Sequence, residues 1–100
     1  MRQYELYLVI DAEVEEEDVN AIVERMTQLI SSGDGETTGE VTKVEARGRR
    51  RLIYPVKKKS EGQDVLLYFQ TPPQALTEME RVLKLDERVL RYLLVRADES

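Results

Sequence analysis

The chain has 100 residues, of which 41% are hydrophobic, and a formal net charge of −5. This size suits one small domain with a modest core. It contains no Cys and no His, which excludes disulfides, thiolate nucleophiles, Cys-ligated metal and an imidazole general base. No apolar run approaches the roughly 20 residues of a membrane span, and the opening residues do not resemble a cleavable signal sequence. We therefore expect a cytoplasmic protein without metal or cofactor.

The charges are unevenly distributed along the chain. Eight of the fifteen basic residues lie between Lys43 and Lys59, where Glu45 is the only acid, and the acids concentrate between Asp11 and Glu24. This pattern predicts a molecule with one acidic side and one basic side. Solvated charge also keeps small proteins soluble, so charge alone does not decide whether the basic run has a binding role.

The segment from Tyr4 to Ile10 alternates with a period of two, which predicts a half-buried strand. The expected core side chains are Tyr4, Leu6, Leu8 and Ile10, and the opposite ones are Glu5, Tyr7 and Val9. The second set is too apolar for a face in contact with water alone. It indicates contact with a partner or with flanking strands.

Apolar residues at steps of three and four from Val19 to Ile30 predict an amphipathic helix. Acids at 15–18 would occupy its first turn, where negative charge suits the helix dipole. This explains the acidic run better than paired catalytic carboxylates, which need environments that separate their pKa values. Residues 31–39 are rich in Gly, Ser and Thr and predict a mobile loop.

Residues 41–57 predict an unusually long strand with a bulge near Gly48, because its apolar residues do not keep one alternation. The alternation of Leu52, Tyr54 and Val56 predicts that all three face the core. Pro55 lacks an amide N–H, so it belongs at a sheet edge or a strand end. Residues 57–62 would form a charged turn, and residues 64–70 would return as a central strand of a long hairpin.

Pro72 and Pro73 predict the start of a second helix, with a buried stripe of Leu76, Met79, Val82 and Leu83. Residues 89–96 predict the last strand. It would carry Leu90, Tyr92 and Leu94 on one side and Arg91, Leu93 and Val95 on the other. The order βαββαβ predicts the α+β ferredoxin-like fold: a four-stranded antiparallel sheet with two helices on one face. We expect one domain over residues 1–100, with 97–100 as a flexible tail.

Residues 48–57 resemble a signature of the bacterial small-subunit ribosomal protein S-six family, in which Gly and basic residues lead into Leu-Ala/Ser-Tyr-Pro-Ile. The matching residues are Gly48, Arg50, Arg51, Leu52, Tyr54, Pro55 and Lys57. Ile53 and Val56 depart from the signature but remain apolar. Residues 1–5 and 89–96 also resemble the family's opening and last strand, so the resemblance covers nearly the whole chain.

The resemblance implies the same fold, no catalysis, and binding to the central domain of small-subunit ribosomal RNA as a heterodimer with ribosomal protein S-eighteen. It also places Tyr92 and Leu94 inward and the alternate residues on the open sheet face. The expected RNA or partner contacts are Arg2, Arg47, Arg49, Arg50, Arg51, Lys57, Lys58 and Arg91. The expected partner contacts on the open face are Tyr7, Leu93 and Val95. Arg forks and Lys amino groups suit phosphate oxygens, although ion pairing or solvation explains Arg49 and Lys58 equally well.

Two other classes of protein fit the same fold. An acyl-phosphate hydrolase would need a Gly-rich, anion-binding loop after the first strand, where this chain has Asp11-Ala12-Glu13, which would repel a phosphate. A non-ribosomal regulatory or self-associating module would bind a small molecule or a second copy on the open sheet face. Such a module should ignore both ribosomal RNA and the partner protein.

Overall fold

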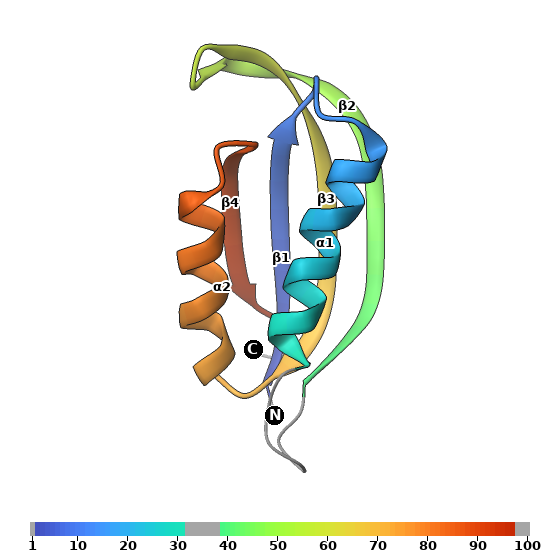
Figure 1. Cartoon of the computed structure of the whole chain (residues 1–100), viewed down its shortest axis with the longest axis vertical. Coiled ribbons are helices and arrows are strands. Elements are labelled where there is room, and N and C mark those ends of the chain that lie inside the picture. Colours follow the sequence, from blue (N-terminus) through green and yellow to red (C-terminus); the bar gives the residue numbers. More distant parts are fainter. Residues whose placement is uncertain (1, 32–38, 98–100) are drawn as a thin grey trace.

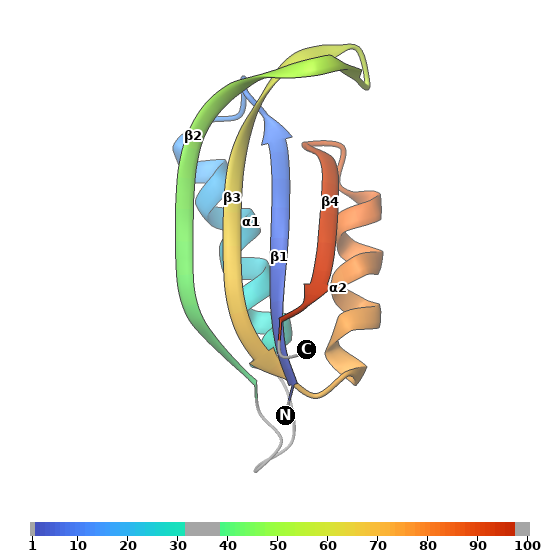
Figure 2. The same ribbon diagram turned by 180° about the vertical axis from the view of Figure 1, so that it is seen from behind.

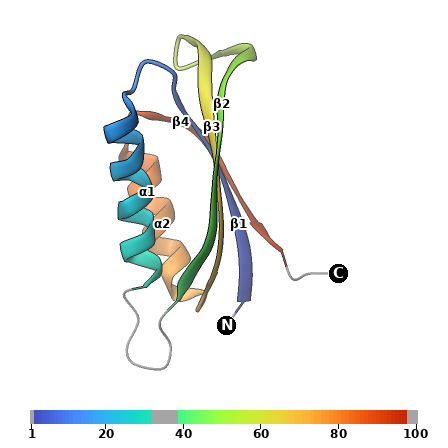
Figure 3. The ribbon, with the colours of Figure 1, turned by 90° about the vertical axis from the view of Figure 1, so that its right-hand side faces the viewer.

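The computed structural model describes residues 2–31 and 39–97. Its elements are β1 (Arg2–Asp11), α1 (Glu16–Ile30), β2 (Glu40–Val56), β3 (Lys59–Thr71), α2 (Gln74–Leu85) and β4 (Val89–Arg96) (Figure 1). The strands form one antiparallel sheet in the order β2-β3-β1-β4. Both helices cover the same face, and the other face carries no helix (Figure 3). The predicted fold is confirmed. The predicted mobile loop and flexible tail lie for the most part outside the described residues.

The main core fills the space between the helices and the sheet. Its strand residues include Tyr4, Leu6, Leu8 and Ile10 of β1, all buried as the alternation predicts. The buried stripe of α1 consists of Val19, Ile22, Met26 and Ile30, and α2 contributes Met79 and Leu83. Phe69 of β3 stacks on Tyr4 with ring centroids 5.6 Å apart. The two periods, two for strands and 3.6 for helices, therefore account for this core.

The first turn of α1 contains Glu16, Glu17 and Asp18, in line with the expected role of the acidic run. The N-cap residue, Glu15, makes no side-chain capping hydrogen bond. Negative charge near the free N–H groups is thus the stabilisation available at this helix end.

The β2–β3 hairpin is longer and its turn is tighter than the sequence predicts. Gly48 has a φ of 83° where the register shifts, which confirms the bulge. The turn consists of Lys57 and Lys58, whose φ angles of 51° and 66° are both positive, and β3 begins at Lys59. Two positive φ angles define a tight hairpin turn that usually carries Asn or Gly. The predicted turn, residues 57–62, is too long. Lys57 and Lys58 are neither Asn nor Gly, so the sequence does not indicate a two-residue turn at this position.

The predicted burial of Tyr54 is wrong. Leu52 is 7% exposed, whereas Tyr54 is 63% exposed. Arg51 pairs with Glu61 and Val56 pairs with Lys59, so residues 52–55 stand opposite a single residue of β3. This break in the ladder ends the alternation, and Tyr54 turns into solvent.

The predicted grouping of Leu90 with Tyr92 and Leu94 is also wrong. The β1–β4 register shifts between Val9 and Ile10, so that Val89 enters the main core and Leu90 does not. Leu90 instead packs on the helix-free face, in a second apolar group that we call the small cluster. The small cluster consists of Val9, Leu52 and Leu90, with Val56 packed against it.

Candidate nucleic-acid interface

The hairpin tip, which we define as residues 51–58, curls over the end of β1 toward the start of β4 (Figures 1 and 2). Leu52 and Val56 fasten it to the sheet through the small cluster. The amino group of Lys57 also donates a hydrogen bond to the Val89 carbonyl oxygen at 2.9 Å. The tip is therefore attached to β4, a strand that neither β2 nor β3 pairs with directly.

Three of the predicted contact residues form ion pairs within the chain. Arg47 pairs with Glu45 at 2.9 Å, Arg49 with Glu61 at 3.4 Å and Arg50 with Asp64 at 2.7 Å. These pairs are accessible to solvent, where ion pairs add little to stability. An RNA phosphate could therefore replace the carboxylate at low cost, but in the free protein these cations are already neutralised.

Three cations of the hairpin tip form no ion pair with the residues that the structure describes. Arg51 and Lys58 are exposed and form no ion pair there. Lys57 is bound to a neutral carbonyl oxygen. The hairpin tip thus carries positive charge that the described part of the chain does not neutralise through an ion pair.

The structure brings Arg91 close to this end of the sheet and leaves Arg2 at the other end. Arg91 pairs with Val9, a member of the small cluster. Arg2 pairs with Thr71 where β1 begins, far from the tip (Figure 1). The predicted basic residues therefore do not form one patch.

The open sheet face contains the three predicted apolar contacts as neighbours. Tyr7 pairs with Leu93, and the adjacent Glu5 pairs with Val95. Leu93 is 60% exposed, and Tyr7 and Val95 are also exposed. The Tyr7 hydroxyl donates to Glu5 at 2.8 Å, and this bond raises the pKa of Tyr7. The exposed apolar side chains thus lie together on β1 and β4, with the Glu5 carboxylate beside them.

At the β2 side, the open face ends in charged residues. The Lys43 amino group lies 5.6 Å from the centre of the Tyr68 ring, a distance that suits a cation–π contact. Lys43 also pairs with Glu45 at 2.7 Å. Hydrogen bonds from Lys43 and then Arg47 lower the pKa of Glu45. An apolar centre with a charged rim is typical of a protein interface.

A basic pocket of about 750 Å³ lies beside the hairpin tip, and the sequence did not predict it. Its cations are Lys57 and Lys59 from the hairpin and Lys84 and Arg88 from the end of α2 and the following turn. Only the curl of the hairpin unites these two segments. Lys84 by itself indicates no more than a cation at a helix C-terminus, so no sequence signal could have found the site.

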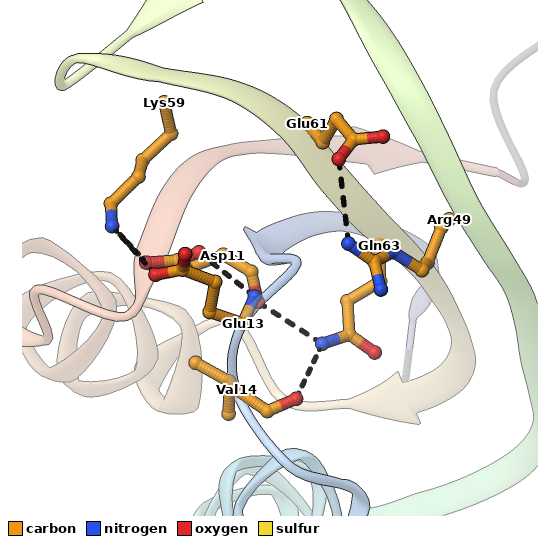
Figure 4. Close-up of polar contacts among 7 residues, drawn as sticks. All are labelled: Asp11, Glu13, Val14, Arg49, Lys59, Glu61 and Gln63. Carbon is orange, nitrogen blue, oxygen red and sulfur yellow. Dashed lines mark hydrogen bonds and ion pairs between the residues drawn. The ribbon is translucent and has the colours of Figure 1, made fainter.

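Acidic residues in and beside this pocket neutralise part of its positive charge, and Asp11 and Glu87 line the pocket itself. Lys59 lies 3.3 Å from Asp11 and 3.1 Å from Glu13 (Figure 4). The Glu13 backbone N–H and then Lys59 lower the pKa of Asp11. Arg88 lowers the pKa of Asp86, and the more distant Lys57 adds to this effect. The segment after β1 thus presents carboxylates, which do not suit an acyl-phosphate site.

The connection from β1 to α1 is fixed by Gln63 of β3. Its side-chain amide donates to the carbonyl oxygens of Asp11 at 3.0 Å and Val14 at 2.8 Å (Figure 4). The carboxylates that face Lys59 are therefore held in place.

In the described ranges, 2–31 and 39–97, neither helix is long and apolar enough to cross a membrane.

The chain is thus a small ferredoxin-like α+β protein with a cationic hairpin tip and an uncovered sheet face. The model of the family described as Ribosomal protein S6 matches residues 3–96, and the chain belongs to this family. It is 42% identical to the small ribosomal subunit protein bS6 of Moorella thermoacetica over 100% of this chain and 98% of that protein. It is 40% identical to the bS6 protein of Caldanaerobacter subterraneus over 99% of this chain and 100% of that protein.

A solved structure supports the same assignment. The crystal structure of 30S ribosomal protein S6 from Thermotoga maritima matches with a TM-score of 0.81 and 32% identity, covering 95% of this chain and 86% of that chain. The predicted family and fold are confirmed. The relatives are named as ribosomal proteins and not as enzymes, so the chain is a ribosomal protein of the small subunit and the hydrolase alternative is dropped.

Proposed function

We propose that this protein binds the central domain of small-subunit ribosomal RNA together with ribosomal protein S-eighteen, with which it forms a heterodimer in the cytoplasmic ribosome. The observation that carries this proposal is the position of the unneutralised tip cations beside a sheet face that no helix covers. The cations supply phosphate contacts, and the face supplies the protein contact. Neither role requires a catalytic group.

Phosphate binding is assigned first to Arg51 and Lys58, because both are exposed and form no ion pair with the described residues. Such contacts position a protein on folded RNA and do not read its sequence. Arg47, Arg49 and Arg50 would contribute by exchanging a carboxylate for a phosphate. They add less net binding, because an existing ion pair must break in the exchange.

Partner binding is assigned to Tyr7, Leu93 and Val95 on the open face. A protein with a net charge of −5 is repelled by RNA over most of its surface, so a basic partner would supply the charge that this chain lacks. Joint binding also follows from linkage, because a partner that adds phosphate contacts raises the affinity of the pair for RNA.

The test is a titration of the protein into a central-domain ribosomal RNA fragment, with and without S-eighteen, at two salt concentrations. We expect tight binding only with the partner, and weaker binding at the higher salt because phosphate contacts release counterions. The double variant R51Q/K58Q should lower the salt slope by about 2, roughly 1 for each phosphate that the variant no longer binds.

The matched control is R25Q/R81Q, which removes the same charge from the exposed surface of the two helices. It should bind nearly as the wild type does. Equally weakened binding of the two double variants would mean that only net charge matters. Absence of RNA binding in all conditions, with no affinity for S-eighteen, would contradict the proposed function and favour a ligand-binding module.

A further inference from the structure

Residues 53–55 form an apolar surface that projects from the hairpin tip. Ile53 is 94% exposed and Tyr54 is 63% exposed, and Pro55 is exposed as well. Within residues 2–31 and 39–97, the Tyr54 side chain makes no hydrogen bond and no ring contact. An Ile and a Tyr that are exposed side by side indicate a binding surface.

This surface is held at both ends. Leu52 precedes it and Val56 follows it, and both pack into the small cluster. The Lys57 amino group is bound to the Val89 carbonyl oxygen at 2.9 Å. Tyr54 is therefore presented on a short segment whose ends are fixed, and little conformational entropy is lost when a ligand covers it.

The segment that carries this surface has charge of one sign. Residues 49–59 contain six basic residues and no acid. Arg49, Arg50 and Lys59 pair with acids that lie outside this stretch. Arg51 and Lys58 remain without an ion pair in the described part of the chain. A molecule that binds here should therefore have a flat apolar face of its own and, next to it, a negative charge.

An unpaired stretch of RNA combines these two properties, because each base has a flat π face and each nucleotide a phosphate. A basic partner protein, as proposed for S-eighteen, would be repelled by the tip cations. The charge complementarity thus favours RNA over the partner protein at this place.

We propose that Tyr54 stacks on an unpaired base of the bound RNA, while Arg51 and Lys58 hold phosphates of the adjoining nucleotides. This inference rests on the proposed function and adds to it a specific contact with a single-stranded part of the RNA. The small cluster positions Tyr54 for this contact.

The experiment compares Y54F and Y54L in binding to the central-domain RNA fragment with S-eighteen present. Y54F keeps the aromatic ring and should bind within about twofold of the wild type. Y54L keeps apolar area but has no ring, and it should bind about tenfold more weakly, in the range of one stacked base. Its salt slope should equal that of the wild type, because no charge is removed.

A second readout uses the absence of Trp from the chain. Y54W introduces a single Trp at the tip, and Q28W introduces one on the exposed surface of α1. Stacking on a base should quench the emission of Y54W when RNA is added. The emission of Q28W in the same mixture should not change. A change that both variants share would come from the partner protein and not from stacking at the position of Tyr54.

Wild-type affinity of Y54L, or unchanged emission of Y54W on RNA binding, would overturn the inference and leave the proposed function standing. Weaker binding of Y54L to S-eighteen in the absence of RNA would show that the tip contacts protein, and would overturn it as well. If the wild type with S-eighteen does not bind the RNA fragment, the proposed function fails, and this inference fails with it.

Discussion

The main core and the small cluster lie on opposite faces of the same sheet and depend on the sequence in different ways. Apart from Val89, the main core collects residues that follow the periods of strand and helix. The small cluster joins Val9, Leu52 and Leu90 from three strands, and it exists only because two ladders shift register. Local patterns therefore determine the main core, whereas the small cluster depends on where the hairpin folds back.

The two groups also differ in what they hold. The main core joins the helices to the sheet. The small cluster, together with the Lys57–Val89 hydrogen bond, sets the position of the hairpin tip. Damage to the main core should unfold the protein, and damage to the small cluster should release the tip from a folded protein. Single substitutions in each group distinguish these two outcomes.

Replacing Leu67 with Ala should have the largest effect. Its side chain is fully buried in the main core, and the removal of buried methyl groups leaves a cavity that the packed sheet and helices cannot close. We expect the free energy of unfolding to fall by about 4 kcal/mol, measured by denaturant titration. A fall below about 1 kcal/mol would mean that the core can collapse around the site.

Replacing Leu52 with Ala should cost less, about 2 kcal/mol, because the small cluster lies at the surface and can partly close. NMR chemical shifts should change at the tip and near Val9 and Leu90, and stay constant in the helices. RNA affinity should fall although the fold remains. Shift changes throughout the main core would contradict the separation of the two groups.

Replacing Gly48 with Ala tests the bulge that precedes the curl of the hairpin. Its φ of 83° is unfavourable for a residue with a Cβ, but an added Cβ would meet no atom within 4 Å. The cost should be that of the backbone alone, about 1 kcal/mol, seen as a small shift of the denaturation midpoint. A much larger cost would indicate contacts that the fold does not show.

The smallest effect is a pH dependence at Asp86. Arg88 lowers its pKa in the folded state, so the carboxylate adds stability above its ordinary pKa, and this stability is lost as the pH falls through the lowered value. D86N should be less stable than the wild type near neutral pH, by under about 1 kcal/mol because the Arg88 side chain is partly exposed to water. The two unfolding free energies should converge once the pH falls below the lowered pKa of Asp86; a constant difference would contradict the role of ionisation.

The sequence predicts the six elements, the main core and the basic run, because each is a local pattern. It does not predict the exposure of Tyr54, since alternation continues through residues 52–56 while the ladder does not. It also does not show that Arg50 is paired, because Asp64 lies across the hairpin at a distance that the bulge and the turn decide. Lys84 and Arg88 reach the pocket beside Lys57 through the curl of the hairpin, a tertiary feature without a sequence pattern.

The outer position of β2 has a consequence for the free protein. An unpaired strand edge is a template for strand addition and aggregation. This edge carries a row of cations, a bulge at Gly48 and, at Pro55, a residue without an N–H donor. Two copies that approached edge to edge would meet a broken ladder of donors and, near the hairpin tip, the like charge of Arg51. The residues proposed to hold RNA therefore also oppose the growth of a continuous sheet between copies before assembly.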